Sequence, residues 1–169
     1  RVMQAFIGLG SNLDNPVQRL ISALAALQRL PGLTLLHHSR LFSSTPIGPQ
    51  DQPDYVNAVA AIRFAGSPHD LLYTLQALEL AGGRQRVRHW GERTLDLDIL
   101  LIDDQRIDSP DLLVPHPQMT QRAFVLVPLM DIDPHCLLPD GTPLSSFLDQ
   151  VENQQLSPLD ELDRDALIN

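Results

Sequence analysis

Residues 93–101 read RTLDLDILL, and this stretch has the two-residue period of a β-strand. The apolar residues that we expect on one face are Leu95, Leu97, Ile99 and Leu101. Asp96 and Asp98 share the opposite face, roughly 6–7 Å apart along the strand. Two like charges this close repel each other, so we expect a positively charged group to lie between the two carboxylates.

A divalent cation is the group that best suits this pair. Mg²⁺ binds through one or two carboxylates and completes its octahedral coordination with water and phosphate oxygens. The alternative is an ordinary amphipathic strand whose polar face is solvated. The pattern D-x-D alone favours that alternative, so the choice depends on the residues upstream.

The segments around this strand predict the fold. Apolar side chains at helical spacing indicate helices over 17–30 and 69–81, with Asp14 or Asn15 capping the first helix and Ser67 the second. Alternating or continuous apolar runs indicate strands over 2–9, 33–42, 55–64 and 95–102. The order βαββαβ predicts a ferredoxin-like α+β core, in which an antiparallel sheet carries two helices on one face.

The C-terminal third is expected to be an extension of short strands and helices. A turn leads to a short strand at 106–107, a helical segment is broken by Pro128, and a last short helix follows within 139–151. Residues 149–169 carry six acids and one Arg and read as an acidic tail. We expect a single domain over 1–169, since no linker interrupts the pattern.

Composition narrows the class of protein. The net charge of −9 argues against nucleic-acid binding, and no apolar run approaches the roughly 20 residues of a membrane helix. The N-terminal stretch has no long apolar segment typical of a signal peptide, and Cys136 is the only cysteine. We therefore expect a cytoplasmic protein, a monomer, that acts on small molecules.

The basic residues are all arginines, and four of the twelve, Arg84, Arg86, Arg88 and Arg93, fall within ten positions. Arginine pairs bidentately with phosphate oxygens, so a dense cluster suits a small polyanion. The cluster lies directly before the strand that carries Asp96 and Asp98. This order places cationic side chains next to potential metal ligands, and phosphoryl transfer needs both. The alternative is a solvated loop with surface ion pairs. Trp90 within it is either a hydrophobic anchor or a lid over a nucleotide.

Two further clusters suit a flat heterocycle and a phosphate. Tyr55 and Asn57 share a strand face, where a ring can stack and an amide can donate and accept hydrogen bonds. His116, Arg122 and Phe124 follow later in the chain. Taken singly, such residues are more often strand-edge or surface positions. Gly8 and Gly10 do not form a phosphate-binding loop and read as turn and packing glycines.

Several of these segments carry a family resemblance. The stretch HWGERTLDLDIL (89–100) resembles the signature of the 6-hydroxymethyl-7,8-dihydropterin pyrophosphokinases of folate biosynthesis. Similar segments in the same order are GLGSNL (8–13), GPQDQPDYVNA (48–58), LELAGGRQR (78–86) and VPHPQMTQRAFVLVPL (114–129). The resemblance covers residues 4–148 and implies a ferredoxin-like fold, in agreement with the order of elements.

The resemblance also implies a reaction, the transfer of pyrophosphate from ATP to the hydroxymethyl group of the dihydropterin, with release of AMP and use of two Mg²⁺ ions. Catalytic roles would fall to Arg84, Arg93, Asp96 and Asp98, the two aspartates holding the metals. The implied ATP-binding residues are Gln76, Glu79, Arg84, Arg86, Trp90, Arg93, Ile99, His116 and Arg122. The implied pterin-binding residues are Ser44, Thr45, Ile47, Tyr55, Asn57 and Phe124.

Two other functions stay open at this point. A non-catalytic module could bind a nucleotide or pterin as a sensor, although such a module has no need of two metal ligands beside an arginine cluster. A different Mg²⁺-dependent phosphotransferase could act on another heterocyclic alcohol. Release of AMP from ATP indicates pyrophosphoryl transfer, whereas ADP indicates an ordinary kinase.

Overall fold

The computed structural model describes residues 2–44, 54–82 and 94–159. One antiparallel sheet contains β1 (Val2–Ser11), β2 (Leu33–His38), β3 (Phe42–Ser44), β4 (Tyr55–Ala65), β5 (Leu95–Ile102) and β8 (Leu156–Pro158). The strand order is β5-β1-β4-β3-β8, and β2 also pairs with β4. The order of elements and the antiparallel sheet confirm the ferredoxin-like prediction.

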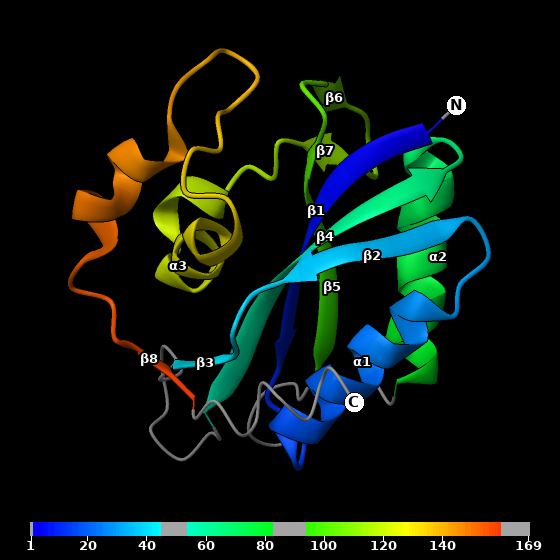
Figure 1. The fold of residues 1–169 in the computed structure, drawn as a ribbon, viewed down its shortest axis with the longest axis horizontal. Helices are drawn as coiled ribbons and strands as arrows, with labels where there is room; N and C mark the ends of the chain where they lie inside the picture. The colour runs from blue at the N-terminus through cyan, green and yellow to red at the C-terminus, as the bar shows by residue number, and fades with distance from the viewer. Residues whose placement is uncertain (1, 45–53, 83–93, 160–169) are drawn as a thin grey trace.

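Two helices, α1 (Pro16–Gln28) and α2 (Pro68–Ala81), cover one face of the sheet (Figure 1). Leu20, Leu24 and Leu27 of α1 and Leu71 and Leu75 of α2 are buried against the strands in the first hydrophobic core. Ser67 caps α2 as predicted, because its side chain accepts a hydrogen bond from the Asp70 N–H while the Asp70 carboxylate accepts one from the Ser67 N–H.

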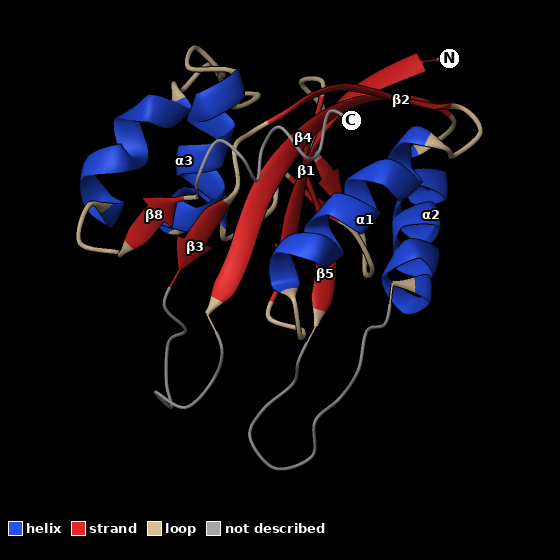
Figure 2. Cartoon of the chain, turned by 60° about the horizontal axis from the view of Figure 1, so that its bottom comes forward, coloured by secondary structure: helices blue, strands red, loops and turns tan. Residues whose placement is uncertain are grey.

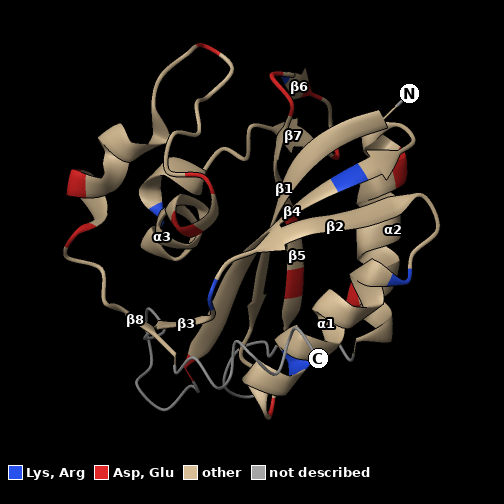
Figure 3. Ribbon diagram, in the orientation of Figure 1, with Lys and Arg blue, Asp and Glu red and all other residues tan. Residues whose placement is uncertain are grey.

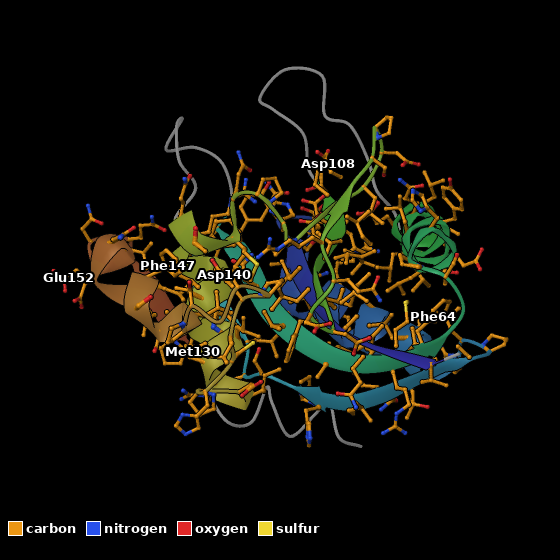
Figure 4. The ribbon with its side chains drawn as sticks, turned by 90° about the horizontal axis from the view of Figure 1, so that it is seen from above. Phe64, Asp108, Met130, Asp140, Phe147 and Glu152 are labelled. Atoms are coloured by element: carbon orange, nitrogen blue, oxygen red, sulfur yellow. The ribbon has the colours of Figure 1, made fainter. Side chains whose placement is uncertain are left out.

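The opposite face carries the C-terminal extension, whose layer is seen from above in Figure 4. On that face it consists of α3 (Ala123–Ile132) and the 3₁₀ helices η1 (Met119–Gln121) and η2 (Leu144–Val151). The ribbon of β6 (Ile107–Asp108) and β7 (Leu113–Val114) instead lies beside α2, because Val114 is buried in the first core and Asp111 accepts a hydrogen bond from Tyr73. Leu126 and Leu129 of α3 are fully buried in the second core, against which Phe147 and Met130 also pack. No helix in the described ranges is long and apolar enough to span a membrane.

The predicted strand over 33–42 is in fact two strands, β2 and β3. Ser39 lies between them and is fully buried. Its Oγ accepts a hydrogen bond from the Val59 N–H (2.9 Å), and its own N–H donates to the Val59 carbonyl (2.8 Å). A side chain thus replaces a backbone group in the ladder, which ends β2 and lets β3 start in a new direction.

Three further segments differ in detail from what the sequence predicts. Asn15 is the residue before α1, but it has left-handed dihedral angles (φ 57°, ψ 60°) and its side chain makes no capping bond within the described structure. Pro128 does not break the helix: it is a buried residue inside α3, which continues on both sides of it. The first part of the expected acidic tail has regular structure, since residues 149–151 complete η2 and β8 forms the edge strand beside β3 (Figure 2). The rest of that tail, 160–169, lies outside the described residues.

Candidate active site

A pocket of about 230 Å³ lies on the sheet face that also carries α3. Its floor is set by strand register, since Gly8 and Gly10 of β1 pair with Asp98 and Asp96 of β5, and Gly10 also pairs with Asn57 of β4. The remaining lining comes from Leu9, Tyr55, Ala58, Leu100, His116, Arg122, Phe124 and Val125. The carboxylates, the aromatic rings and the histidine–arginine pair therefore line one pocket.

A β-bulge shapes this face. Phe6 pairs with Leu101 and Ile7 with Ile99, so Leu100 is an extra residue in β5. After the bulge the faces are exchanged, and Leu101 packs in the second core instead of sharing a face with Leu95 and Leu97. The expected alternation therefore ends at Ile99, and Leu100 closes the pocket next to Gly8.

The two aspartates differ in environment. Asp96 is half-buried and Asp98 is exposed, and both belong to the acidic segment of β5 in Figure 3. Thr94 donates a hydrogen bond from Oγ1 to Oδ2 of Asp96 (2.8 Å). Thr94 is itself held by Asn12, whose Oδ1 accepts from the Thr94 N–H (2.9 Å) and whose N–H donates to the Thr94 carbonyl (3.3 Å). A rigid support thus orients the Asp96 carboxylate.

Sequence reasoning missed Asn12 and Thr94 as supporting residues. Both are buried, with exposed fractions of 1% and 6%. Thr94 stands two positions before Asp96, and in a strand that spacing places the two side chains on one face. The spacing was therefore a usable signal for Thr94, whereas Asn12 is 82 residues away and its contact depends on the sheet.

Three of the proposed heterocycle-binding residues, Tyr55, Asn57 and Phe124, line the same pocket. Asn57 is 5% exposed, and its Oδ1 accepts a hydrogen bond from Ser44 Oγ (2.9 Å). Ser44 therefore acts through its side chain, which orients the amide of Asn57. Tyr55 at the start of β4 and Phe124 near the start of α3 supply half-buried rings to the same pocket.

The histidine and arginine come from the segment that leads into α3. The His116 N–H donates to the Leu100 carbonyl (2.9 Å), and His116 Nδ1 accepts from the Gln118 N–H (3.2 Å). Burial lowers the pKa of His116 from its usual 6.5, the Asp98 charge opposes this shift, and the Arg122 charge adds to it. The imidazole is therefore neutral at pH 7 with its proton on Nε2. The Arg122 guanidinium lies 5.4 Å from the centre of the Phe124 ring and donates to Gln118.

A second pocket of about 300 Å³ shares Asp98 and His116 with the first. It lies along the outer edge of β5 and is lined mainly by apolar residues, including Leu72, Ile99, Leu112 and Leu113. Ile99 thus lies beside this pocket, on the other side of the strand from the carboxylate face.

The two predicted positions on α2 differ. Gln76 is exposed. Glu79 is buried, and its Oε2 accepts a hydrogen bond from the Leu97 N–H of the edge strand (2.8 Å). Glu79 therefore ties α2 to β5. The remaining predicted residues, Thr45, Ile47, Arg84, Arg86, Trp90 and Arg93, lie outside the described residues, as does the rest of the arginine cluster.

The site has the donors for a hard cation but not a complete protein cage. Within 2–44, 54–82 and 94–159, no three His, Cys, Asp or Glu side chains are grouped to hold a metal ion. Two carboxylates that project from one strand beside an open pocket fit Mg²⁺, which takes its other ligands from water and phosphate oxygens. The donor set therefore suits a metal ion that arrives with a phosphate ligand.

Fold and site together define a ferredoxin-like protein whose pocket combines two carboxylates with two aromatic rings, an amide, a histidine and an arginine. The family model of 7,8-dihydro-6-hydroxymethylpterin-pyrophosphokinase (HPPK) matches residues 6–134. The chain therefore belongs to the 7,8-dihydro-6-hydroxymethylpterin-pyrophosphokinase family.

Individual relatives agree with this assignment. The chain is 50% identical over 147 residues to the 2-amino-4-hydroxy-6-hydroxymethyldihydropteridine pyrophosphokinase of Pseudomonas aeruginosa. This alignment covers 87% of this chain and 91% of that protein. The chain is 45% identical over 158 residues to the enzyme of the same name from Haemophilus influenzae, with 94% and 99% covered.

A solved structure resembles the chain in fold. The crystal structure of Plasmodium falciparum HPPK-DHPS with pteroate superposes with a TM-score of 0.69 at 14% identity. The match covers 89% of this chain but only 42% of that one, so this chain spans less than half of the solved protein. At that identity the likeness concerns the fold alone.

Proposed function

We propose that the protein transfers the β,γ-pyrophosphoryl group of ATP to the hydroxymethyl oxygen of 6-hydroxymethyl-7,8-dihydropterin, releasing AMP, as a step of folate biosynthesis. The observation that carries this proposal is the single pocket in which Tyr55, Asn57 and Phe124 adjoin the carboxylates of Asp96 and Asp98. In a member of this family, that arrangement supports a ring-binding site directly beside a phosphate site.

The pterin ring binds between the rings of Tyr55 and Phe124. The amide of Asn57, oriented by Ser44, lies at the buried end of this space and recognises the hydrogen-bonding edge of the heterocycle. A ring bound there directs its hydroxymethyl group toward β5, where the carboxylates lie. Specificity thus depends on a buried amide, which discriminates strongly against a ring that leaves it unpaired. Thr45 and Ile47, which lie outside the described residues, complete the pterin-binding set that the family resemblance implies.

Asp96 and Asp98 would hold two Mg²⁺ ions, which when bound supply positive charge against the phosphate oxygens. His116 presents its Nε2–H to a phosphate oxygen, since its Nδ1 already accepts from Gln118. Arg122 is held over Phe124, between the ring and the phosphates. Arg84, Arg86 and Arg93 bind the triphosphate from the preceding segment, with Arg84 and Arg93 opposing the charge that develops on the transferred group.

The adenine of ATP occupies the second pocket, at the edge of β5. The Leu97 N–H points outward there to Glu79, and the two-residue period of the strand directs the backbone groups of Ile99 the same way. These groups can pair with a nucleobase, while Leu72 and Leu112 contact its faces. Gln76 on α2 and Trp90 complete the nucleotide site. Asp98 and His116 line both pockets, so the triphosphate extends past these two residues from the second pocket to the first.

The protein acts on small molecules in the cytoplasm, without nucleic acid, a membrane or a partner chain. Its net charge of −9 opposes binding to phosphate backbones. We expect the protein to act as a monomer.

Product analysis tests the proposed reaction. The protein is incubated with ATP, Mg²⁺ and the dihydropterin alcohol, and nucleotides are separated by chromatography. We expect AMP and pterin diphosphate in equal amounts. ADP in place of AMP would mean an ordinary kinase, and binding of both ligands without any product would mean a sensor.

A further inference from the structure

Gln154 makes two hydrogen bonds that flank Arg122. Its Oε1 accepts from the Ala123 N–H (2.8 Å), and its Nε2 donates to the Gln121 carbonyl (2.9 Å). The side chain therefore contacts the backbone on either side of Arg122, from a position more than 30 residues further along the chain.

The start of α3 needs an acceptor from another segment, because the residue at its N-cap position is an arginine. The first N–H groups of a helix require acceptors from outside the helix. Arg122 occupies the N-cap position with extended dihedral angles (φ −125°, ψ 115°), and an arginine side chain carries donors only. Its guanidinium lies instead over Phe124 and donates to Gln118. The Arg122 side chain therefore cannot accept a hydrogen bond from the first turn of α3. The Gln154 side chain provides that acceptor, for the Ala123 N–H.

The same C-terminal segment is also linked, through β3, to Asn57 of the pocket. β8 pairs with β3, with Leu156 opposite Ser44, and the Leu159 N–H donates to the Leu41 carbonyl (2.9 Å). Ser44 in turn orients Asn57. Figures 1 and 2 show β8 beside β3, in the part of the molecule where α3 lies.

We propose that Gln154 and the segment 154–159 are positioning elements of the active site: they hold Arg122 and Phe124 at a set distance from Asn57. The segment lies beyond residues 6–134, which match the family model. This inference rests on the proposed function for the identity of the ligand, because the spacing of these residues is what a flat ring between Tyr55 and Phe124 requires.

The test compares Gln154→Ala with Gln154→Glu and with Gln155→Ala. Gln154→Ala removes both contacts, whereas Gln154→Glu retains an acceptor for the Ala123 N–H and loses only the donor to Gln121. Gln155 is an exposed neighbour with the same side chain, and no bond of that side chain is found within the described ranges, so Gln155→Ala is the matched control. Ala25→Gly in α1, on the other face of the sheet, lowers stability without touching the pocket.

The readout is the dissociation constant of the dihydropterin, measured by calorimetry with a non-hydrolysable ATP analogue and Mg²⁺. We expect a five- to tenfold increase for Gln154→Ala, about the factor that a lost helix cap is worth, and a smaller increase for Gln154→Glu. Gln155→Ala and Ala25→Gly should bind as the wild type does. KM for the pterin should rise in parallel in Gln154→Ala.

Two results would overturn the proposal. The first is an unchanged dissociation constant in Gln154→Ala. The second is an equal increase in Ala25→Gly, because general destabilisation would then explain the loss. Failure of the proposed function is a separate result, since it appears as absence of AMP with the wild-type protein, whatever the Gln154 variants do.

Discussion

Thr94 Oγ1 and Asp96 Oδ2 are joined by a hydrogen bond of 2.8 Å, which makes the two oxygens of the carboxylate unequal. Oδ2 accepts the hydrogen bond from the Thr94 hydroxyl, and we propose that Oδ1 is the oxygen that binds the metal. Because the Thr94 backbone is held by Asn12, the bond connects the sheet to the carboxylate that we propose as a metal ligand. Partners of this kind commonly decide how well a ligand binds its metal.

Thr94→Val should weaken metal binding by about 10- to 100-fold, because valine keeps the shape and the backbone contact but removes the hydroxyl donor. Thr94→Ser should bind metal almost as the wild type does. Electron paramagnetic resonance of Mn²⁺, with a non-hydrolysable ATP analogue present, measures the affinity without turnover. Equal affinities in the valine and serine variants would show that the hydroxyl has no role.

Asp96→Asn and Asp98→Asn should each lower kcat by about 10²–10³ and leave the fold intact, by analogy with the loss of one electrostatic contact in a transition state. The matched control is Asp104→Asn, an exposed aspartate in the turn after β5. Steady-state kinetics at saturating Mg²⁺ and circular dichroism check both parts. Near wild-type turnover in both β5 variants would exclude the metal assignment.

Gly10→Ala should reduce pterin affinity far more than Gly8→Ala. A Cβ at Gly10 would lie 2.9 Å from Asn57 Nδ2, too close for contact, whereas a Cβ at Gly8 would lie 3.4 Å from Leu100 Cδ2. Because Ser44 holds the other end of the Asn57 amide, the amide must leave its position in the alanine variant at residue 10. Calorimetric titration with the dihydropterin compares the two, and equal affinities would argue against a role for the Asn57 orientation.

His116 should titrate below its usual pKa of 6.5 in the metal-free protein, since burial disfavours the imidazolium. The unfolded chain then binds the proton more readily, so the contribution of His116 to stability is present above pH 6.5 and is lost as the pH falls toward the lowered pKa. NMR of the imidazole protons gives the pKa directly. In His116→Gln, the free energy of unfolding should fall less between pH 7.5 and 5 than in the wild type, and a pKa at or above 6.5 would refute the prediction.

Local sequence determined much of this protein. The apolar spacing of the two helices, the Ser67 cap and the alternation around Asp96 and Asp98 are properties of short segments, because side-chain direction repeats every 3.6 residues in a helix and every two in a strand. The family motif then indicated which residues meet, including Tyr55, Asn57, His116 and Arg122, although they lie far apart in the chain.

Tertiary structure decided what depends on contacts between distant segments. Ser39 ends β2 by bonding to Val59, the bulge at Leu100 follows from pairing with β1, and Pro128 is a buried residue inside a helix that continues past it. Asn12 reaches Thr94, and Gln154 reaches Ala123, only once the sheet and the second core have formed. Such contacts form only when packing of the two cores brings distant segments together, so they leave no periodic signal in the sequence. They orient the site residues that the family motif had indicated.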